Sequence, residues 1–332
     1  MTSLAISLSV LDLCPVPQGS GPKQALENSL VLARHTEQLG YKRFWVAEHH
    51  NMSGIASAAT SVVMGYLAAG TDRIRIGSGG IMLPNHAPLQ IAEQFGTLES
   101  LYPGRIDLGL GRAPGTDPAT AQALRHGRGD GSDFPEMLDE LRRLFAEPQP
   151  GQRLRAVPGA GLKVPIWLLG SSTFSAQLAA QLGLPFAFAG QFSPDYMFGA
   201  FKTYREHFQP SETLEQPHVM LGINAYVAAS KEQANVLATS HQQAFLNLIR
   251  GRPGPLPPAV EDMEAIWQPH EKHSVLSTLA GTLVGDEQTV SQQLSELLER
   301  TGANELIINS SIYDQTLRQE SYQRMMAVTN RL

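Results

Sequence analysis

Short runs of β-forming residues alternate with longer segments of helical periodicity along the whole chain of 332 residues. This succession predicts parallel strands joined by helices, because parallel neighbours need a long crossover connection. Eight strand–helix pairs are the number that closes a (β/α)8 TIM barrel. We therefore expect an α/β fold of this kind, formed by a single domain over residues 1–332. The predicted strands cover residues 4–11, 43–47, 73–78, 105–110, 164–169, 185–189, 219–228 and 305–309.

The main alternative is a doubly wound open sheet that binds a dinucleotide. That fold carries a G-x-G-x-x-G turn directly after its first strand. Here the first predicted strand leads into Pro15-Val16-Pro17-Gln18-Gly19 instead. The barrel is therefore the better interpretation of the pattern.

Two long insertions interrupt the regular alternation, one after the fourth strand and one after the seventh. The first, residues 111–134, is rich in glycine, and the second, residues 251–280, contains the run RPGPLPP. Connections of this length in a compact barrel are typical of lids and binding loops, although a passive surface insertion has the same appearance. For residues 251–280 we expect a mobile lid, because the Pro/Gly composition predicts few backbone hydrogen bonds.

The composition excludes several classes of function. The chain has 25 Lys and Arg against 31 Asp and Glu, a formal net charge of -6, which argues against nonspecific binding of nucleic acid or an anionic membrane. Cys14 is the single cysteine, so no intrachain disulfide can form. The sequence shows no apolar stretch of about 20 residues and no basic n-region of a signal peptide. We expect a cytoplasmic protein.

Histidines follow the second predicted strand, at the end of the barrel where active sites form. Adjacent residues on an extended segment point in opposite directions, so we expect only one of His49 and His50 to enter the site. The same geometry argues against a zinc pair, which needs histidines four residues apart on a helix. We predict no metal site.

A candidate anion site follows the fifth strand. Gly170, Ser171 and Ser172 precede a helix that contains Ser175, and hydroxyl and free N–H groups at a helix start bind phosphate well. Ordinary helix capping by Ser172 would give the same pattern. Arg112, in a glycine-rich loop after the fourth strand, would supply a fixed positive charge at the same end of the barrel.

Three segments carry a resemblance to a known family. They are WVAEHHNMSGIAS (45–57), RIGSGGIMLPNHAPLQIAEQFGTLESLYPGRIDLGLGRAPGT (75–116) and PIWLLGSSTFSAQLAAQLGLPFAFA (165–189). They resemble the bacterial luciferase-like flavin-dependent monooxygenases, most of all the group 1, YhbW-like branch. The resemblance covers nearly the whole chain in order. It implies a (β/α)8 barrel, reduced FMN as cofactor or cosubstrate, and a homodimer.

The resemblance also assigns residues. It implies a cis peptide bond between Gly79 and Gly80, where the backbone touches the flavin ring, and an active-site histidine at His49 with Glu48 beside it. The flavin-phosphate contacts that it implies fall on Arg112, Ser171, Ser172 and Ser175.

Two positions depart from true luciferases. Their reactive cysteine corresponds to Gly111, and their acidic residue on the phosphate side corresponds to Ser171. Aldehyde luminescence is therefore not expected, while flavin binding is.

The expected reaction is flavin-dependent monooxygenation of a small organic substrate. As the resemblance implies, reduced FMN would react with O2 to give a flavin C4a-hydroperoxide, and the protein would exclude water and orient the substrate. His49 would donate or accept a proton. A separate NAD(P)H-dependent flavin reductase would supply the reduced flavin, since the chain has no dinucleotide fingerprint. The alternatives are a deazaflavin (F420)-dependent oxidoreductase that moves hydride without O2, and a non-catalytic flavin-binding protein.

Overall fold

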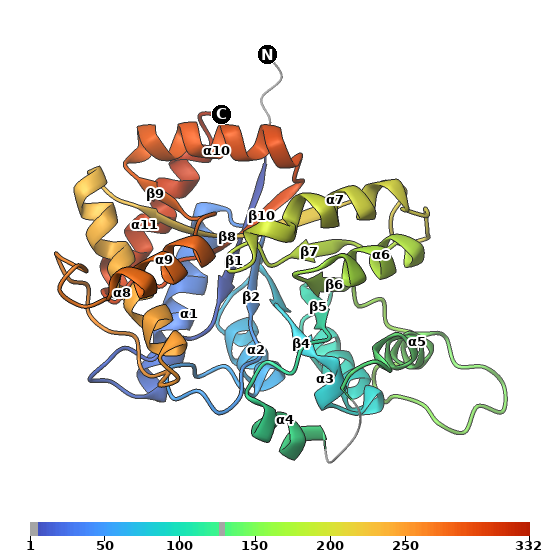
Figure 1. Ribbon diagram of the computed structural model, residues 1–332. Coiled ribbons are helices and arrows are strands. Elements are labelled where there is room, and N and C mark those ends of the chain that lie inside the picture. Colours follow the sequence, from blue (N-terminus) through green and yellow to red (C-terminus); the bar gives the residue numbers. More distant parts are fainter. Residues whose placement is uncertain (1–5, 126–129) are drawn as a thin grey trace.

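Parallel strands close into a barrel that is surrounded by helices (Figure 1). The structure, a computed structural model, describes residues 6–125 and 130–332, so residues 4 and 5 of the first predicted strand lie outside the described residues. The eight strands of the barrel are those that the sequence predicts, and the expected (β/α)8 architecture is confirmed. They are β1 (Ser7–Asp12), β2 (Arg43–Val46), β3 (Arg75–Ser78), β5 (Ile106–Gly111), β6 (Ile166–Gly170), β7 (Phe186–Phe188), β8 (Val219–Val227) and β10 (Glu305–Asn309).

The last strand closes the barrel by pairing on both sides. β10 pairs with β1, with Ser7 opposite Glu305, and also with β8, with Glu305 opposite Met220. All the pairings around the barrel are parallel. Two short strands at the rim escaped the sequence analysis: β4 (Ile81–Met82) pairs with β5, and β9 (Leu283–Gly285) pairs with β8.

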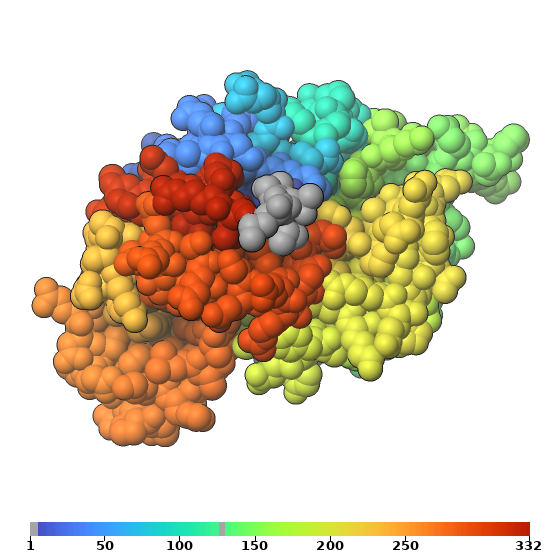
Figure 2. Space-filling view, turned by 90° about the horizontal axis from the view of Figure 1, so that it is seen from above, coloured from blue at the N-terminus to red at the C-terminus, as the bar shows by residue number. Residues whose placement is uncertain are grey.

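Helices cover the outside of the barrel, and none of those in residues 6–125 and 130–332 has both the length and the apolarity of a membrane-crossing segment. The connection between α5 and β6 extends away from the body of the molecule (Figures 1 and 2). The α-helices are α1 (Pro22–Leu39), α2 (Thr60–Ala69), α3 (Pro88–Leu101), α4 (Pro118–Arg125), α5 (Phe134–Phe145), α6 (Thr173–Leu182), α7 (Met197–Glu206), α8 (Lys231–Ile249), α9 (Pro269–Thr278), α10 (Glu287–Thr301) and α11 (Gln315–Thr329).

Both long insertions are present, after β5 and after β8, and each contains a helix that the sequence analysis did not predict. The expectation that residues 251–280 make few backbone hydrogen bonds is wrong. The backbone of Leu256 bonds to Val16 and Gln18, at 2.8 Å each, and α9 forms the end of the segment. The carboxylate of Glu271 accepts two hydrogen bonds of 2.7 Å from Arg250. The side chains of Trp267 and Val275 also pack in an apolar cluster of this insertion.

Buried charges fill the N-terminal end of the barrel. The Arg43 guanidinium donates to Asp107 Oδ2 at 2.7 Å and to Glu305 Oε1 at 2.9 Å, and it lies 4.7 Å from the Trp167 ring centroid. Burial would raise the pKa of Glu305, but His218 and the neighbouring cations outweigh burial and lower it to about 2. Since each carboxylate has a cationic partner, the desolvation cost of burying the charges is offset.

We expect Arg43→Met to lower the free energy of unfolding by about 3–5 kcal/mol, the usual cost of leaving a buried charge without its partner. The measurement is chemical denaturation followed by circular dichroism. Lys23→Met is the matched control, because Lys23 pairs with Glu27 on the exposed face of α1, where such pairs contribute little. Equal stability of the two variants would contradict a structural role for the buried cluster.

Candidate active site

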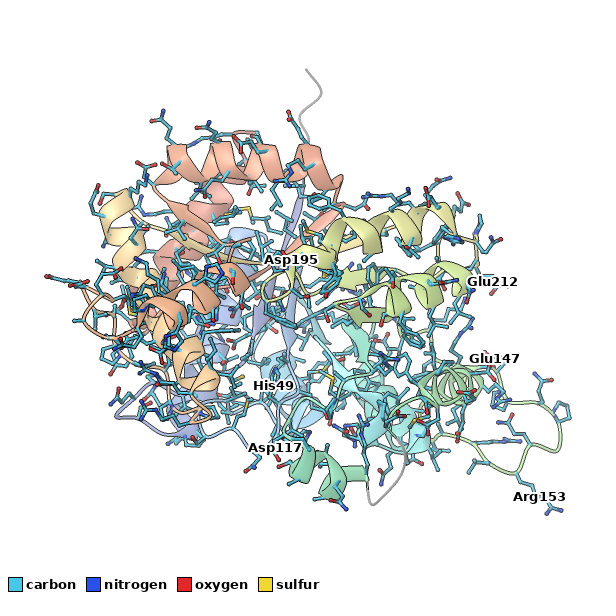
Figure 3. All side chains as sticks on the ribbon, viewed as in Figure 1. His49, Asp117, Glu147, Arg153, Asp195 and Glu212 are labelled. Atoms are coloured by element: carbon cyan, nitrogen blue, oxygen red, sulfur yellow. The ribbon has the colours of Figure 1, made fainter. Side chains whose placement is uncertain are left out.

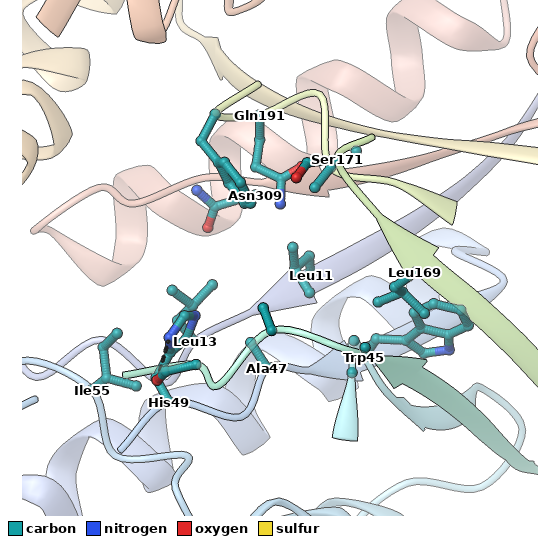
Figure 4. A pocket seen from close by; sticks show the side chains of 18 of the residues that line it. Leu11, Leu13, Trp45, Ala47, His49, Ile55, Leu169, Ser171, Gln191 and Asn309 are labelled. Carbon is teal, nitrogen blue, oxygen red and sulfur yellow. Dashed lines mark hydrogen bonds between the residues drawn. The ribbon is translucent and has the colours of Figure 1, made fainter. Parts of the chain in front are cut away.

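A cavity of about 570 Å³ opens at the C-terminal ends of the barrel strands. Its volume lies within the range of small-molecule and cofactor sites. In the close-up of Figure 4, His49 and Ile55 lie on one side of the cavity, and Ser171, Gln191 and Asn309 lie on the other. The part of the cavity toward the barrel interior is apolar. Its walls are formed by Leu11, Trp45, Ala47, Leu169, Ala187 and Ile307.

Glycines keep this end of the barrel open. Gly79 and Gly80 line the cavity, and the peptide bond between them is cis, as the resemblance implies. A Cβ on Gly80 would lie 2.8 Å from the carbonyl oxygen of Gly109, so no side chain fits there without a shift. At Gly79 and Gly80 the cavity is therefore lined by backbone alone, which a planar ring can approach closely.

His49 follows β2 and enters the cavity, whereas His50 does not line it. The Nδ1 atom of His49 lies 3.3 Å from the carbonyl oxygen of Gly115, and burial lowers the pKa of His49 below its usual value. A carbonyl oxygen only accepts hydrogen bonds, so the neutral ring carries its proton on Nδ1. This leaves Nε2 as a proton acceptor.

Glu48 lies outside the cavity lining and contacts the rim loop of residues 81–86, which contains β4. Its carboxylate accepts hydrogen bonds from His50 Nε2 at 2.8 Å, His86 Nε2 at 3.0 Å and the Met82 backbone N–H at 3.0 Å. Burial opposes ionisation of Glu48, but the hydrogen bonds from the two histidines outweigh it and lower the pKa to about 2. The geometry thus gives Glu48 contacts that hold the loop. The catalytic role implied by the resemblance stays a prediction.

The structure brings the predicted anion-binding residues to one edge of the cavity. Arg112, Ser171, Ser172 and Ser175 all line it. Within the described part of the chain no hydrogen bond or ion pair engages the Arg112 guanidinium, which stacks 4.2 Å from the ring centroid of Phe174 on α6.

The start of α6 is also open to a ligand. Ser172 occupies the N-cap position, but its side chain caps no backbone N–H. Ser175 Oγ would lie 2.7 Å from a Cβ on Gly170, so a larger residue at 170 would crowd the serine. Unpaired N–H groups, hydroxyls and a guanidinium are the donors that a phosphate monoester prefers.

Several polar residues of the cavity lining were missed by sequence reasoning, among them Gln191 and Asn309 on the side that faces His49 (Figure 4). Asn224 Nδ2 donates to the Gln191 carbonyl oxygen at 2.7 Å, and Asn309 Nδ2 donates to Asn224 Oδ1 at 2.9 Å. These residues line the cavity together with His241 of α8. The sequence pattern could have indicated the two asparagines. Each is a polar residue in the second half of an apolar strand, two residues after an inward-facing position, Gly222 or Ile307.

No group of three or more His, Cys, Asp or Glu side chains among the described residues is arranged to hold a metal ion.

The sequence profile of a family described as luciferase-like monooxygenase matches residues 6–305. The chain belongs to this family. A luciferase-like monooxygenase of Escherichia coli K12 is 53% identical over 333 residues, covering 100% of this chain and 99% of the relative. An N-acetyl-S-alkylcysteine monooxygenase of Bacillus subtilis is 34% identical, with 96% of each chain covered. This protein is therefore an oxidoreductase that incorporates oxygen from O2.

Solved structures share the fold. The crystal structure of apo-MsnO8 matches with a TM-score of 0.90 and 35% identity over 98% of both chains. Two more distant structures show the fold alone. One is the oxygenating constituent of 3,6-diketocamphane monooxygenase from Pseudomonas putida in complex with FMN, with TM-score 0.71, 16% identity and coverage of 97% of this chain and 96% of that one. The other is an F420-dependent secondary alcohol dehydrogenase with an F420-acetone adduct, with TM-score 0.66, 15% identity and coverage of 98% and 99%.

We expect Glu48→Ala to speed hydrogen exchange of the Met82 amide roughly tenfold or more, because a hydrogen bond to a charged acceptor is lost. Since folding lowers the pKa of Glu48 from 4.5 to about 2, its contribution to stability is complete above pH 4.5 and is lost as the pH falls toward 2. The measurement is amide exchange by NMR, with Glu27→Ala on exposed α1 as control. An unchanged Met82 rate would show that Glu48 does not hold this loop.

Proposed function

We propose that this protein is an FMN-dependent monooxygenase that uses reduced FMN and O2 to oxidise a small organic substrate. The observation that carries the proposal is the Arg112 guanidinium, which makes no direct hydrogen bond or ion pair with the described residues, beside the open start of α6 at the edge of an apolar cavity. This arrangement fits the phosphate of FMN, and the bare backbone at Gly79 and Gly80 fits the flat face of its ring.

Each part of the cavity has a defined task in this proposal. Arg112, Ser171, Ser172 and Ser175 hold the phosphate by charge-assisted hydrogen bonds. Reduced FMN, when bound, supplies the chemistry that activates O2. The apolar walls exclude water from the reacting centre. His49 Nε2, a proton acceptor in the neutral ring, receives a proton in the cavity and returns it.

The rival cofactor is a deazaflavin. The fold admits both kinds, because one structural neighbour holds FMN and another holds F420. Two observations favour FMN. The two relatives compared above are named monooxygenases. Among the described residues that line the cavity, Arg112 is the one Lys or Arg, whereas the longer acidic side chain of a deazaflavin calls for more cations. A flavin-binding protein without catalysis remains the rival of another class.

We expect Arg112→Ala to weaken FMN binding about ten- to a hundredfold, since each charge-assisted hydrogen bond contributes roughly 1.5–3 kcal/mol. Turnover at saturating flavin should change little. His49→Ala should leave FMN affinity within severalfold and lower turnover about a hundredfold or more, the scale of a lost acid–base group. FMN titration and O2 consumption with product detection by mass spectrometry measure these effects.

Arg153→Ala and His270→Ala are the matched controls, because both side chains are exposed and Arg153 lies on the loop that extends away from the barrel (Figure 3). The reverse pattern, with His49→Ala abolishing binding and Arg112→Ala binding FMN normally, would overturn the assignment. Turnover without O2 consumption would identify the hydride-transfer alternative. Unaltered oxidation of free reduced FMN, with no product, would identify a binding protein.

We also propose a homodimer formed through α2 and α3. Val62 and Tyr66 lie one turn apart on α2 and are 71% and 42% exposed, and Leu101 at the end of α3 is 64% exposed. Exposed apolar side chains grouped in this way are typical of protein interfaces.

Changing both Val62 and Tyr66 to Asp should shift the protein from dimer to monomer, because burying two carboxylates in an apolar interface is costly. Size-exclusion chromatography with light scattering measures the mass. The control is Leu154→Asp, an exposed leucine on the extended α5–β6 connection. A monomeric wild type, or an unchanged dimer in the double variant, would contradict this interface.

Two further predictions rest on the sequence. They are a separate NAD(P)H-dependent reductase that supplies reduced flavin, and a cytoplasmic location.

A further inference from the structure

One face of α8 forms a wall of the cavity. His241, Ala244, Phe245 and Leu248 line the cavity from this helix, and their spacing places them on a single face. The phosphate-binding residues come from the ends of β5 and β6, and Figure 1 shows α6 and α8 on opposite sides of the barrel strands. The α8 wall therefore bounds the part of the cavity away from the proposed phosphate site.

His241 is the polar residue of this wall, and its Nδ1 is already engaged. The Tyr226 hydroxyl on β8 lies 2.7 Å from His241 Nδ1. Tyr226 is buried, and burial raises the pKa of its hydroxyl well above the usual value, so the hydroxyl keeps its proton. A phenolic O–H is a stronger donor than an imidazole N–H, and an imidazole nitrogen is a stronger acceptor than a phenolic oxygen, so the Tyr226 hydroxyl donates to His241 Nδ1.

This arrangement fixes the tautomer of His241. Since Nδ1 accepts from Tyr226, the proton of the neutral ring resides on Nε2. Burial lowers the pKa of His241 to about 4, so the ring is neutral at physiological pH. Nε2 has no hydrogen-bond partner among the described residues, and it is not one of the enclosed polar atoms, so it is accessible from the cavity.

The charge inventory of the cavity limits what can bind against this donor. Arg112 is the only Lys, Arg, Asp or Glu among the described lining residues, and the proposed phosphate occupies it. An anionic substrate would find no free cation in the cavity, and a cationic substrate would find no carboxylate. Burying either charge without a partner costs much free energy of desolvation. The His241 ring lies edge-on to Phe245 at 6.0 Å, and apolar side chains such as Leu13, Pro15 and Leu256 form much of the remaining cavity lining.

We propose that His241 is a specificity-determining residue, and that the substrate is an uncharged, largely apolar molecule whose oxygen acceptor, such as a carbonyl, takes a hydrogen bond from His241 Nε2. Tyr226 is the positioning residue that sets the tautomer. This inference rests on the proposed function, because it assumes that the flavin phosphate occupies Arg112.

The first experiment reads the tautomer without flavin or turnover. In protein with ¹⁵N-labelled histidine, we expect the His241 ring to show the neutral Nε2–H form at pH 7 and to stay neutral at pH 6. In Tyr226→Phe, the Nδ1–H form should gain population because the donor to Nδ1 is lost. An Nδ1–H ring in the wild type, or a ring protonated at pH 6, would overturn the proposal even if FMN binds as expected.

The second experiment measures binding of three probes of similar shape to the wild type with oxidised FMN bound. They are acetophenone with a carbonyl acceptor, ethylbenzene with none, and the anion benzoate. We expect acetophenone to bind best and benzoate worst. His241→Phe should weaken acetophenone binding about three- to tenfold, the scale of one uncharged hydrogen bond, and leave ethylbenzene unchanged.

His241→Gln, whose amide can donate a hydrogen bond, should restore part of the preference for acetophenone. Ser274→Ala on exposed α9 is the control and should change neither affinity. Equal losses for acetophenone and ethylbenzene in His241→Phe would show a packing role and overturn the proposal. Tightest binding of benzoate would overturn the uncharged substrate class. Failure of FMN to bind, while the His241 tautomer is as expected, would instead reject the proposed function.

Discussion

The pairing of β10 with both β1 and β8 closes the sheet, and the site depends on that closure. A closed barrel has a fixed interior, so its inward side chains decide where space is left. Arg43, Trp45 and Trp167 fill the N-terminal part, with the ion pairs to Asp107 and Glu305 neutralising the charge. Gly79 and Gly80, which follow β3, and Gly111 at the end of β5 leave the C-terminal part open. The same alternation of inward positions thus produces a sealed end and a cavity.

Two imidazole rings face this cavity, and they differ in which ring nitrogen carries the proton. His49 Nδ1 points at a carbonyl oxygen, which only accepts, whereas His241 Nδ1 faces a hydroxyl, which can donate. The first ring presents an acceptor to the cavity and the second a donor, although both are kept neutral by burial. In the proposed function, His49 accepts the proton and His241 orients the substrate, so the two tasks fall to different walls of the cavity.

Much of this molecule could be predicted from local sequence patterns. Physical reasons explain why the remaining parts could not be predicted. The barrel strands are buried on both sides and show as apolar runs, but β4 and β9 are only two and three residues long and carry little periodicity. α9 was missed because Pro269 at its first turn comes after a run rich in proline, while the contacts that hold it, the Arg250–Glu271 pair and the packing of Val275, are tertiary. Arg112 and the serines could be predicted because glycines and strand ends mark them. His241 could not, because its contact with Tyr226 joins a helix to a strand and leaves no trace in either segment's pattern.

Backbone hydrogen bonds join the mouth of the cavity across distant parts of the chain. Leu256 pairs with Val16 and Gln18, and Val16 with Gly54, whose missing side chain makes room for the Gly254 carbonyl group. Backbone groups are the same in every residue except proline, so apart from Gly54 these hydrogen bonds do not depend on which side chains border them. Side chains beside these hydrogen bonds, such as Pro253 and Leu248, can therefore be exchanged during evolution while the mouth keeps its shape. New substrate preferences could arise there without a penalty in folding.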